Sequence, residues 1–228
     1  MTATAITIAA WCPESRRFGL AAATTGCGGA APRLVAHPWR GLVHSLARDL
    51  ASVPLAESLL DKGWRGEALL ARLEGSDGPA DAVWTLDTQG RFAMRIGKMA
   101  QRSFYRASRG PVQAMSLGHG SAAAAFGMLD GFEATEAESL PERLLRALEA
   151  GARACSIAAE SAFIRVMDPA IEYAYTDVTV DIHAQPLVEL RRAHDWLAPL
   201  YDYYAIRGND PTVARYPQWL AQRGIERK

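Results

Sequence analysis

The chain has 228 residues, in which 25 Lys plus Arg balance 25 Asp plus Glu and hydrophobic residues make up 49%. This is the composition of a soluble globular protein with a sizeable core, so it excludes a mainly disordered chain. The zero net charge disfavours a nucleic-acid partner, and no apolar run reaches the ~18 residues that a membrane-spanning helix needs.

The expected strands follow one another in groups along the chain, and most of the expected helices come in pairs. Short apolar stretches bounded by turn residues predict strands, and apolar residues at helical spacing predict helices. In chain order we expect strands at 5–11, 18–25 and 41–46, helices at 53–60 and 65–73, strands at 81–86, 91–96 and 112–117, helices at 121–132 and 140–154, strands at 162–166 and 177–182, and a helix at 186–196. Such pairs disfavour a parallel sheet whose strands alternate with single helices.

This order predicts an α+β fold, namely a four-layer αββα sandwich of two antiparallel sheets flanked by helix pairs. Strands that are apolar throughout fit this arrangement, because both faces of each sheet are then buried. We expect residues 1–206 to form a single domain of this kind and residues 207–228 to form a C-terminal arm. The aromatic residues of 198–228 indicate packing either on the chain's own domain or on a second copy, as a homodimer.

A family resemblance rests on residues 6–9, 13–15, 18–21, 86–91, 132–135, 141–151 and, without a gap, 180–192. On these stretches the chain, from about residue 5 to 206, resembles a bacterial family catalogued as domain-of-unknown-function 1028. That family is assigned to the fold of the N-terminal-nucleophile hydrolases. The resemblance therefore implies the αββα sandwich and an amide hydrolase that acts on a small amide or peptide-like substrate.

The chain departs from the family at polar positions. Ala5 stands where the family often has Thr, Thr7 stands where it has Ser, and Arg95 stands where it has His. Residues 115–117 replace a Gln-Gly-Asn stretch by Met-Ser-Leu. These departures favour the alternative of a non-catalytic relative that binds a small ligand or serves as an assembly protein.

The candidate nucleophile is Thr2. An N-terminal nucleophile needs a hydroxyl or thiol on the first residue and a free α-amine, whose pKa of about 7.7–8.0 suits a base near neutral pH. Removal of Met1 would place both groups on Thr2, whereas Ala5 has no nucleophile. Thr7 and Ser45, which matches a family Thr, are candidates to bind or orient a substrate in the cleft between the sheets.

Asp181 and His183 are the remaining catalytic candidates. Residues i and i+2 of a strand share a face, so this carboxylate could orient the imidazole as a general base. Alternatively, both side chains fix the turn before the helix that begins at Pro186. The scattered cysteines Cys12, Cys27 and Cys155 show no metal-ligand spacing, and they suggest a reducing, cytoplasmic compartment. We therefore expect no metal and no cofactor.

Overall fold

Two antiparallel sheets form the centre of this computed structural model, which describes residues 5–25, 34–45, 52–73, 82–98, 101, 103–118 and 122–224. Within these residues, sheet A has the strand order β10 (Ala174–Val180), β9 (Ser161–Met167), β2 (Phe18–Thr24), β1 (Ala5–Trp11), β8 (Val112–Leu117) and β7 (Phe104–Arg109). Sheet B has the order β3 (Leu34–His37), β4 (Gly41–Ser45), β5 (Ala82–Leu86) and β6 (Phe92–Ile96).

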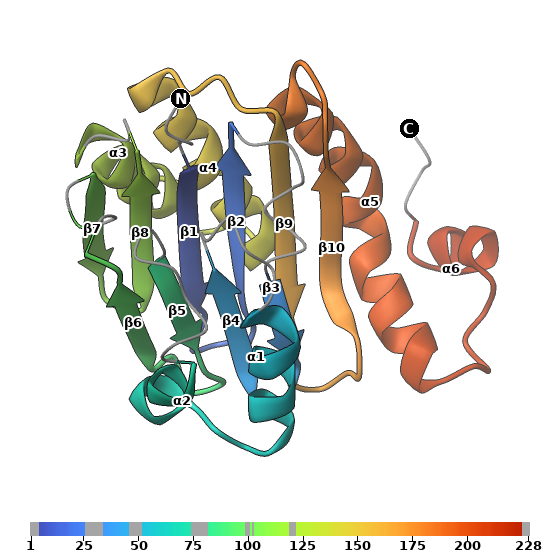
Figure 1. The fold of residues 1–228 in the computed structure, drawn as a ribbon. Coiled ribbons are helices and arrows are strands. Elements are labelled where there is room, and N and C mark those ends of the chain that lie inside the picture. The colour runs from blue at the N-terminus through green and yellow to red at the C-terminus, as the bar shows by residue number, and fades with distance from the viewer. Residues whose placement is uncertain are drawn as a thin grey trace.

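Helices cover the outer face of each sheet (Figure 1). On sheet A lie α3 (Ala122–Glu133), α4 (Leu140–Cys155) and α5 (Pro186–Asn209). On sheet B lie α1 (Ser52–Asp61) and α2 (Gly66–Arg72). The predicted α+β class with two antiparallel sheets is confirmed, and the layers follow the order helix, sheet, sheet, helix.

Three apolar clusters hold these layers together. Phe18, Leu20 and Phe163 of sheet A meet Leu42 and Trp84 of sheet B in the middle cluster. A second cluster fills the space between sheet A and its helices, and a third fills the space between sheet B and α1 and α2. The strands are apolar throughout because each face of each sheet packs against another layer.

The structure differs from the sequence-based elements at two strands. It contains β3 and β7, neither of which was expected. β3 has four residues, and β7 reads FYRASR with exposed arginine and serine side chains, so both lack the continuous apolar run of a buried strand. Both are sheet edges, where one side of the strand has no neighbour and polar residues are tolerated.

Helix α5 is much longer than expected. α5 continues through Pro199 to Asn209, whereas the sequence suggested an end near Trp196. A proline within a helix removes one backbone hydrogen bond, at a cost of about 3 kcal/mol. Leu190, His194 and Tyr201 are buried along α5 on both sides of this proline, and their packing maintains the helix.

The C-terminal arm folds back onto α5. Its helix α6 (Tyr216–Gln222) packs Trp219 and Leu220 against Tyr203, so these aromatic side chains are buried within one chain. The domain boundary expected at residue 206 falls inside α5. The division into domain and arm, and the homodimer through the arm, stay predictions. In the part of the chain that the structure describes, no helix has both the length and the apolar character needed to cross a bilayer.

Candidate functional site

The start of β1, a central strand, lies at one end of the strands of sheet A (Figure 1). Ala5 pairs with Thr24 at the end of β2 and with Leu117 at the end of β8. Thr24 in turn pairs with Ser161 at the start of β9. The antiparallel register therefore brings the start of β1, the ends of β2 and β8, and the start of β9 to the same end of sheet A.

Three hydroxyl side chains lie on the inner face of sheet A near the start of β1. Alternation along the strands places Thr7 on the face of Ala9, Thr24 on that of Ala22, and Ser161 on that of Phe163, which all belong to the cluster between the sheets. Thr7, Thr24 and Ser161 are 0%, 4% and 1% exposed, respectively. The paired residues Thr24 and Ser161 have Cβ atoms about 5 Å apart, and Thr7 lies diagonally across from Thr24, at about 7–8 Å.

Thr7 is the unusual member of this group. Its Oγ1 atom is buried and makes no hydrogen bond. Its cross-strand neighbours are Ala22 and Met115, neither of which has a side-chain oxygen or nitrogen. An unsatisfied buried hydroxyl costs about 1–3 kcal/mol, so the native fold carries a polar group that its own packing does not use.

Sheet B contributes His44 to the same region. The His44 ring is fully buried and lies 5.9 Å, centroid to centroid, from the ring of Phe163. Phe163 lies two residues after Ser161 on β9 and pairs with Ala22, the cross-strand neighbour of Thr7, so the imidazole lies against the inner face of sheet A in the region of these hydroxyls. We call Thr7, Thr24, His44 and Ser161 the inter-sheet polar cluster.

Sequence reasoning missed His44 as a site residue and included its neighbour Ser45. Alternation along β4 places His44 on the inner face with Leu42, and Ser45 on the outer face with Val43. Val43 packs against α1 and α2, so the structure does not bring Ser45 to Thr7. The sequence GLVHS does not reveal which face is the inner one, because Leu42 and Val43 are both apolar.

Asp181 and His183 lie beyond the end of β10. The strand ends at Val180, and Ile182 has a φ of 51°, so the residues i and i+2 do not share a strand face. The carboxylate of Asp181 accepts hydrogen bonds from the Ser161 hydroxyl and from the Ile182 backbone N–H. No hydrogen bond or ion pair joins this carboxylate to the His183 ring within the described residues.

Both side chains bind to the turn before α5. His183 Nδ1 accepts a hydrogen bond of 3.1 Å from the Gln185 backbone N–H, and the His183 backbone N–H donates to the Glu160 carbonyl. This geometry fits the interpretation that they fix the turn. Asp181 still reaches the inter-sheet polar cluster, because its carboxylate holds the Ser161 hydroxyl.

The other positions singled out by the family resemblance have these surroundings. Ala5 is 6% exposed at the start of β1 and presents a methyl group. Arg95 points to the outer face of sheet B, where Nη1 donates to the Leu70 carbonyl of α2 at 2.9 Å. Thr2 lies outside the described residues, so its proposed role as nucleophile stays a prediction.

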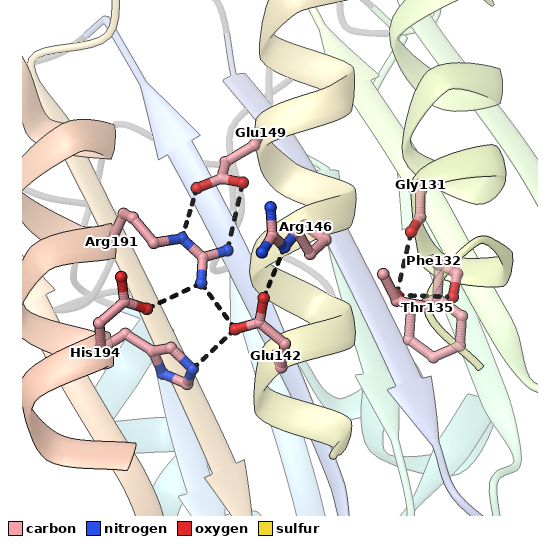
Figure 2. A network of polar contacts seen from close by, with 9 residues as sticks. Gly131, Phe132, Thr135, Glu142, Arg146, Glu149, Arg191 and His194 are labelled. Atoms are coloured by element: carbon pink, nitrogen blue, oxygen red, sulfur yellow. Dashed lines mark hydrogen bonds and ion pairs between the residues drawn. The ribbon is translucent and has the colours of Figure 1, made fainter. Parts of the chain in front are cut away.

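A second polar group lies between α4 and α5, centred on Arg191 (Figure 2). Arg191 donates two hydrogen bonds to the Glu149 carboxylate, and its Nη1 atom lies 2.6 Å from Glu142 Oε2 and 3.0 Å from Asp195 Oδ1. The same Glu142 oxygen lies 3.1 Å from His194 Nε2. These contacts join the two helices over more than one turn of each.

Burial and charge shift the pKa values in this group. Burial lowers the pKa of His194, although the negative charge of Glu142 opposes the shift. Burial also acts to raise the pKa of Glu142, but hydrogen bonds from Arg191 and Arg146 outweigh it and hold that pKa below the ordinary value. Burial raises the pKa of Tyr201, whose hydroxyl lies 3.1 Å from His194 Nδ1, to about 12.

Within the described residues, side chains of the types that bind metal ions come close together at Glu142, His194 and Asp195. The guanidinium of Arg191 already lies between the two carboxylates, and Arg146 supplies a second positive charge to Glu142. These residues therefore fit a helix-to-helix ion-pair network better than a metal site.

Comparisons with known proteins place the sandwich among uncharacterised relatives. Residues 5–190 match the model of a family of unknown function, DUF1028. The crystal structure of protein SPO2555 from Silicibacter pomeroyi, described by the same family model, superposes with a TM-score of 0.74 at 20% sequence identity, covering 86% of each chain. No curated protein matches. At this identity the crystal structure shows a shared fold.

Proposed function

Because residues 5–190 show that the chain belongs to the DUF1028 family, we propose that it keeps the family's sandwich as a binding protein for a small amide or peptide-like ligand. The ligand is held at the inter-sheet polar cluster. The observation that carries this proposal is the Oγ1 atom of Thr7, which is buried, faces the other sheet and has no hydrogen-bond partner.

The chemistry of the cluster suits an amide. A hydroxyl both donates and accepts hydrogen bonds, and a neutral imidazole has one donor and one acceptor nitrogen, so these groups complement an amide N–H and C=O together. The surrounding side chains, including Phe163 and Met115, are apolar. Hydrogen bonds made there are stronger than in water, because little solvent competes for the donors and acceptors.

Binding is favoured over catalysis by the residue at the start of β1. Ala5 stands where the resemblance implies a threonine, and a methyl group can neither attack a carbonyl nor donate a proton. Arg95, at the family's histidine position, is engaged with α2 on the far face of sheet B. Neither of these side chains supplies a reactive group to the space between the sheets.

The test uses N-acetylglycinamide as the probe. We expect it to shift the NMR methyl resonance of Thr7 in a saturable way, and we expect Thr7→Val to weaken the affinity about tenfold, the loss of one buried hydrogen bond. Thr179→Val is the matched control, because Thr179 is an exposed threonine on β10. Unchanged affinity in Thr7→Val, or no saturable shift in the native protein, contradicts the proposal.

A second candidate function is an N-terminal-nucleophile amide hydrolase. It is favoured by the place of β1, whose first residue Ala5 lies beside Thr24 at the cluster, three positions after Thr2 in the chain. In this mechanism the Thr2 hydroxyl oxygen attacks the amide carbon while the α-amine takes the hydroxyl proton and passes it to the departing amine. Water then hydrolyses the ester and restores the threonine.

The two candidates are separated by the chain's first residue. If intact mass spectrometry shows that Met1 is retained, the hydrolase mechanism is excluded, because Thr2 then has no free amine. If Met1 is removed, Thr2→Ala should abolish release of ammonia or amine from amide probes, while Thr4→Ala, the matched control, should keep it. Binding without turnover in the processed native protein supports the first candidate.

A further inference from the structure

A separate cavity of about 500 Å³ opens at the other end of the sandwich. Three segments line it: the turn between β3 and β4 with Trp39, the connection between β9 and β10, and the last turn of α5. The lining residues are Trp39, Ala170, Glu172, Tyr173, Gly208 and Asn209. In Figure 1 the β9–β10 connection lies near the lower end of α5, far from the start of β1.

The two aromatic side chains of this cavity are held in place and remain accessible. Trp39 Nε1 donates to the Pro169 carbonyl at 3.1 Å, and the Tyr173 hydroxyl donates to the Tyr204 carbonyl. Trp39 and Tyr173 nevertheless remain 48% and 39% exposed. Anchored aromatic rings with open surface are pre-organised for a ligand, because little side-chain freedom is lost on binding.

Gly208 makes the position of Tyr173 possible. A Cβ atom at Gly208 would overlap the Tyr173 hydroxyl and the end of its ring. The glycine therefore lets the tyrosine pack against the end of α5, and any larger residue there would displace it from the cavity.

The described lining of the cavity carries a negative charge. Glu172 is its charged lining residue, and none of the described lining residues is basic. Among the nearby guanidinium groups, Arg17 pairs with the Asp168 carboxylate, whereas Arg65 and Arg207 keep their positive charge while they donate to the Trp39 and Val213 backbone carbonyls. The cavity also contains the C-terminal end of α5, where the helix dipole favours positive charge and where Arg207 already lies in the last turn.

We propose that this cavity binds a small organic ammonium ion. The Trp39 and Tyr173 rings supply cation–π attraction, the Glu172 carboxylate supplies the opposite charge, and the end of α5 supplies the negative end of the helix dipole. A sugar or a neutral amide would use the aromatic surface but would gain nothing from the carboxylate, and an anion would be repelled by it.

The test compares choline with 3,3-dimethylbutan-1-ol, its neutral isostere, by isothermal titration calorimetry on the full chain. We expect choline to bind in the millimolar range and the isostere to bind at least about tenfold more weakly, because the two differ in charge and scarcely in shape. Ethanolamine in a third titration shows whether an unmethylated ammonium is accepted as well.

Two substitutions locate the binding. Glu172→Gln keeps the shape of the side chain and should weaken choline binding about fivefold, and Trp39→Leu should weaken it by a similar factor. Glu138→Gln changes an exposed glutamate outside the lining and should leave the affinity unchanged. All of these residues are exposed, so circular dichroism should show native folding in each variant.

The proposal is overturned if choline does not bind, if the neutral isostere binds equally well, or if Glu172→Gln retains native affinity. Binding that is lost in Glu172→Gln but kept in Trp39→Leu would mean a simple surface ion pair, and it would overturn the aromatic part of the site.

Discussion

Replacing Thr7 by Val shows whether its buried hydroxyl serves the fold or a ligand. Thr7 is 0% exposed, its Oγ1 atom has no hydrogen-bond partner, and its neighbours Ala22 and Met115 are apolar. Valine keeps the branched shape that suits a strand and removes the unsatisfied group, which costs about 1–3 kcal/mol. We therefore expect Thr7→Val to raise the free energy of unfolding by about 1 kcal/mol, the lower end of that range.

Urea unfolding followed by circular dichroism measures this change. For a chain of this length, 1 kcal/mol corresponds to a rise in Tm of about 2–4 °C. The control Thr179→Val, at an exposed position of β10, should stay within about 0.5 kcal/mol of the native protein. A loss of 1 kcal/mol or more in Thr7→Val would refute the reasoning, because it would mean that the hydroxyl has a partner in the free protein.

The network between α4 and α5 gives two further predictions. Breaking a buried ion pair on one side costs about 3–5 kcal/mol, and because Glu142 and Glu149 keep 16% and 17% side-chain exposure, we expect Arg191→Met to lower the free energy of unfolding by about 2–3 kcal/mol. In urea unfolding, the exposed Arg192→Met should cost less than about 1 kcal/mol, and equal losses in the two variants would contradict the network's role. Burial lowers the pKa of His194 below its ordinary 6.5, so the unfolded chain binds a proton at this residue more readily than the folded chain does. The contribution of neutral His194 to the free energy of unfolding is therefore full above about pH 6.5 and is lost as the pH falls through the folded pKa. The lowered pKa of Glu142 adds a loss in the same direction at more acidic pH. In unfolding measured across this range, His194→Gln should flatten the upper part of the decline, and an unchanged profile would exclude His194 as its source.

Much of the fold was predictable because its strands carry continuous apolar runs. β1 and β2 lie in the middle of sheet A and are buried on both faces, so their sequences AITIAAW and FGLAAAT contain few polar residues. β7 was not predictable in this way, because this edge strand exposes Arg106 and Ser108. The end of α5 was missed because tertiary packing on both sides of Pro199 outweighs the local cost of the proline.

The candidate site was predictable only in part, because it depends on which face each side chain takes. Thr7 was recognised as a hydroxyl on the first strand, and the structure places it between the sheets. Ser45 and His44 are neighbours on one short strand, and choosing between them requires knowing which face of β4 meets sheet A. Ser161 joins the site through pairing between β2 and β9, which are far apart in the sequence, and no local pattern reveals that pairing.

The central place of β1 also has a consequence for how the chain reaches its native state. Ala5 of β1 pairs with Leu117 of β8, and Thr24 of β2 pairs with Ser161 of β9. The β1–β2 hairpin therefore gains its two flanking strands only from segments that come much later in the chain. Contacts between such distant parts of a chain slow folding, and apolar strand edges that stay open meanwhile invite aggregation. We expect refolding from denaturant to be slow and sensitive to protein concentration, and we expect chaperones that shield the nascent hairpin to raise its yield.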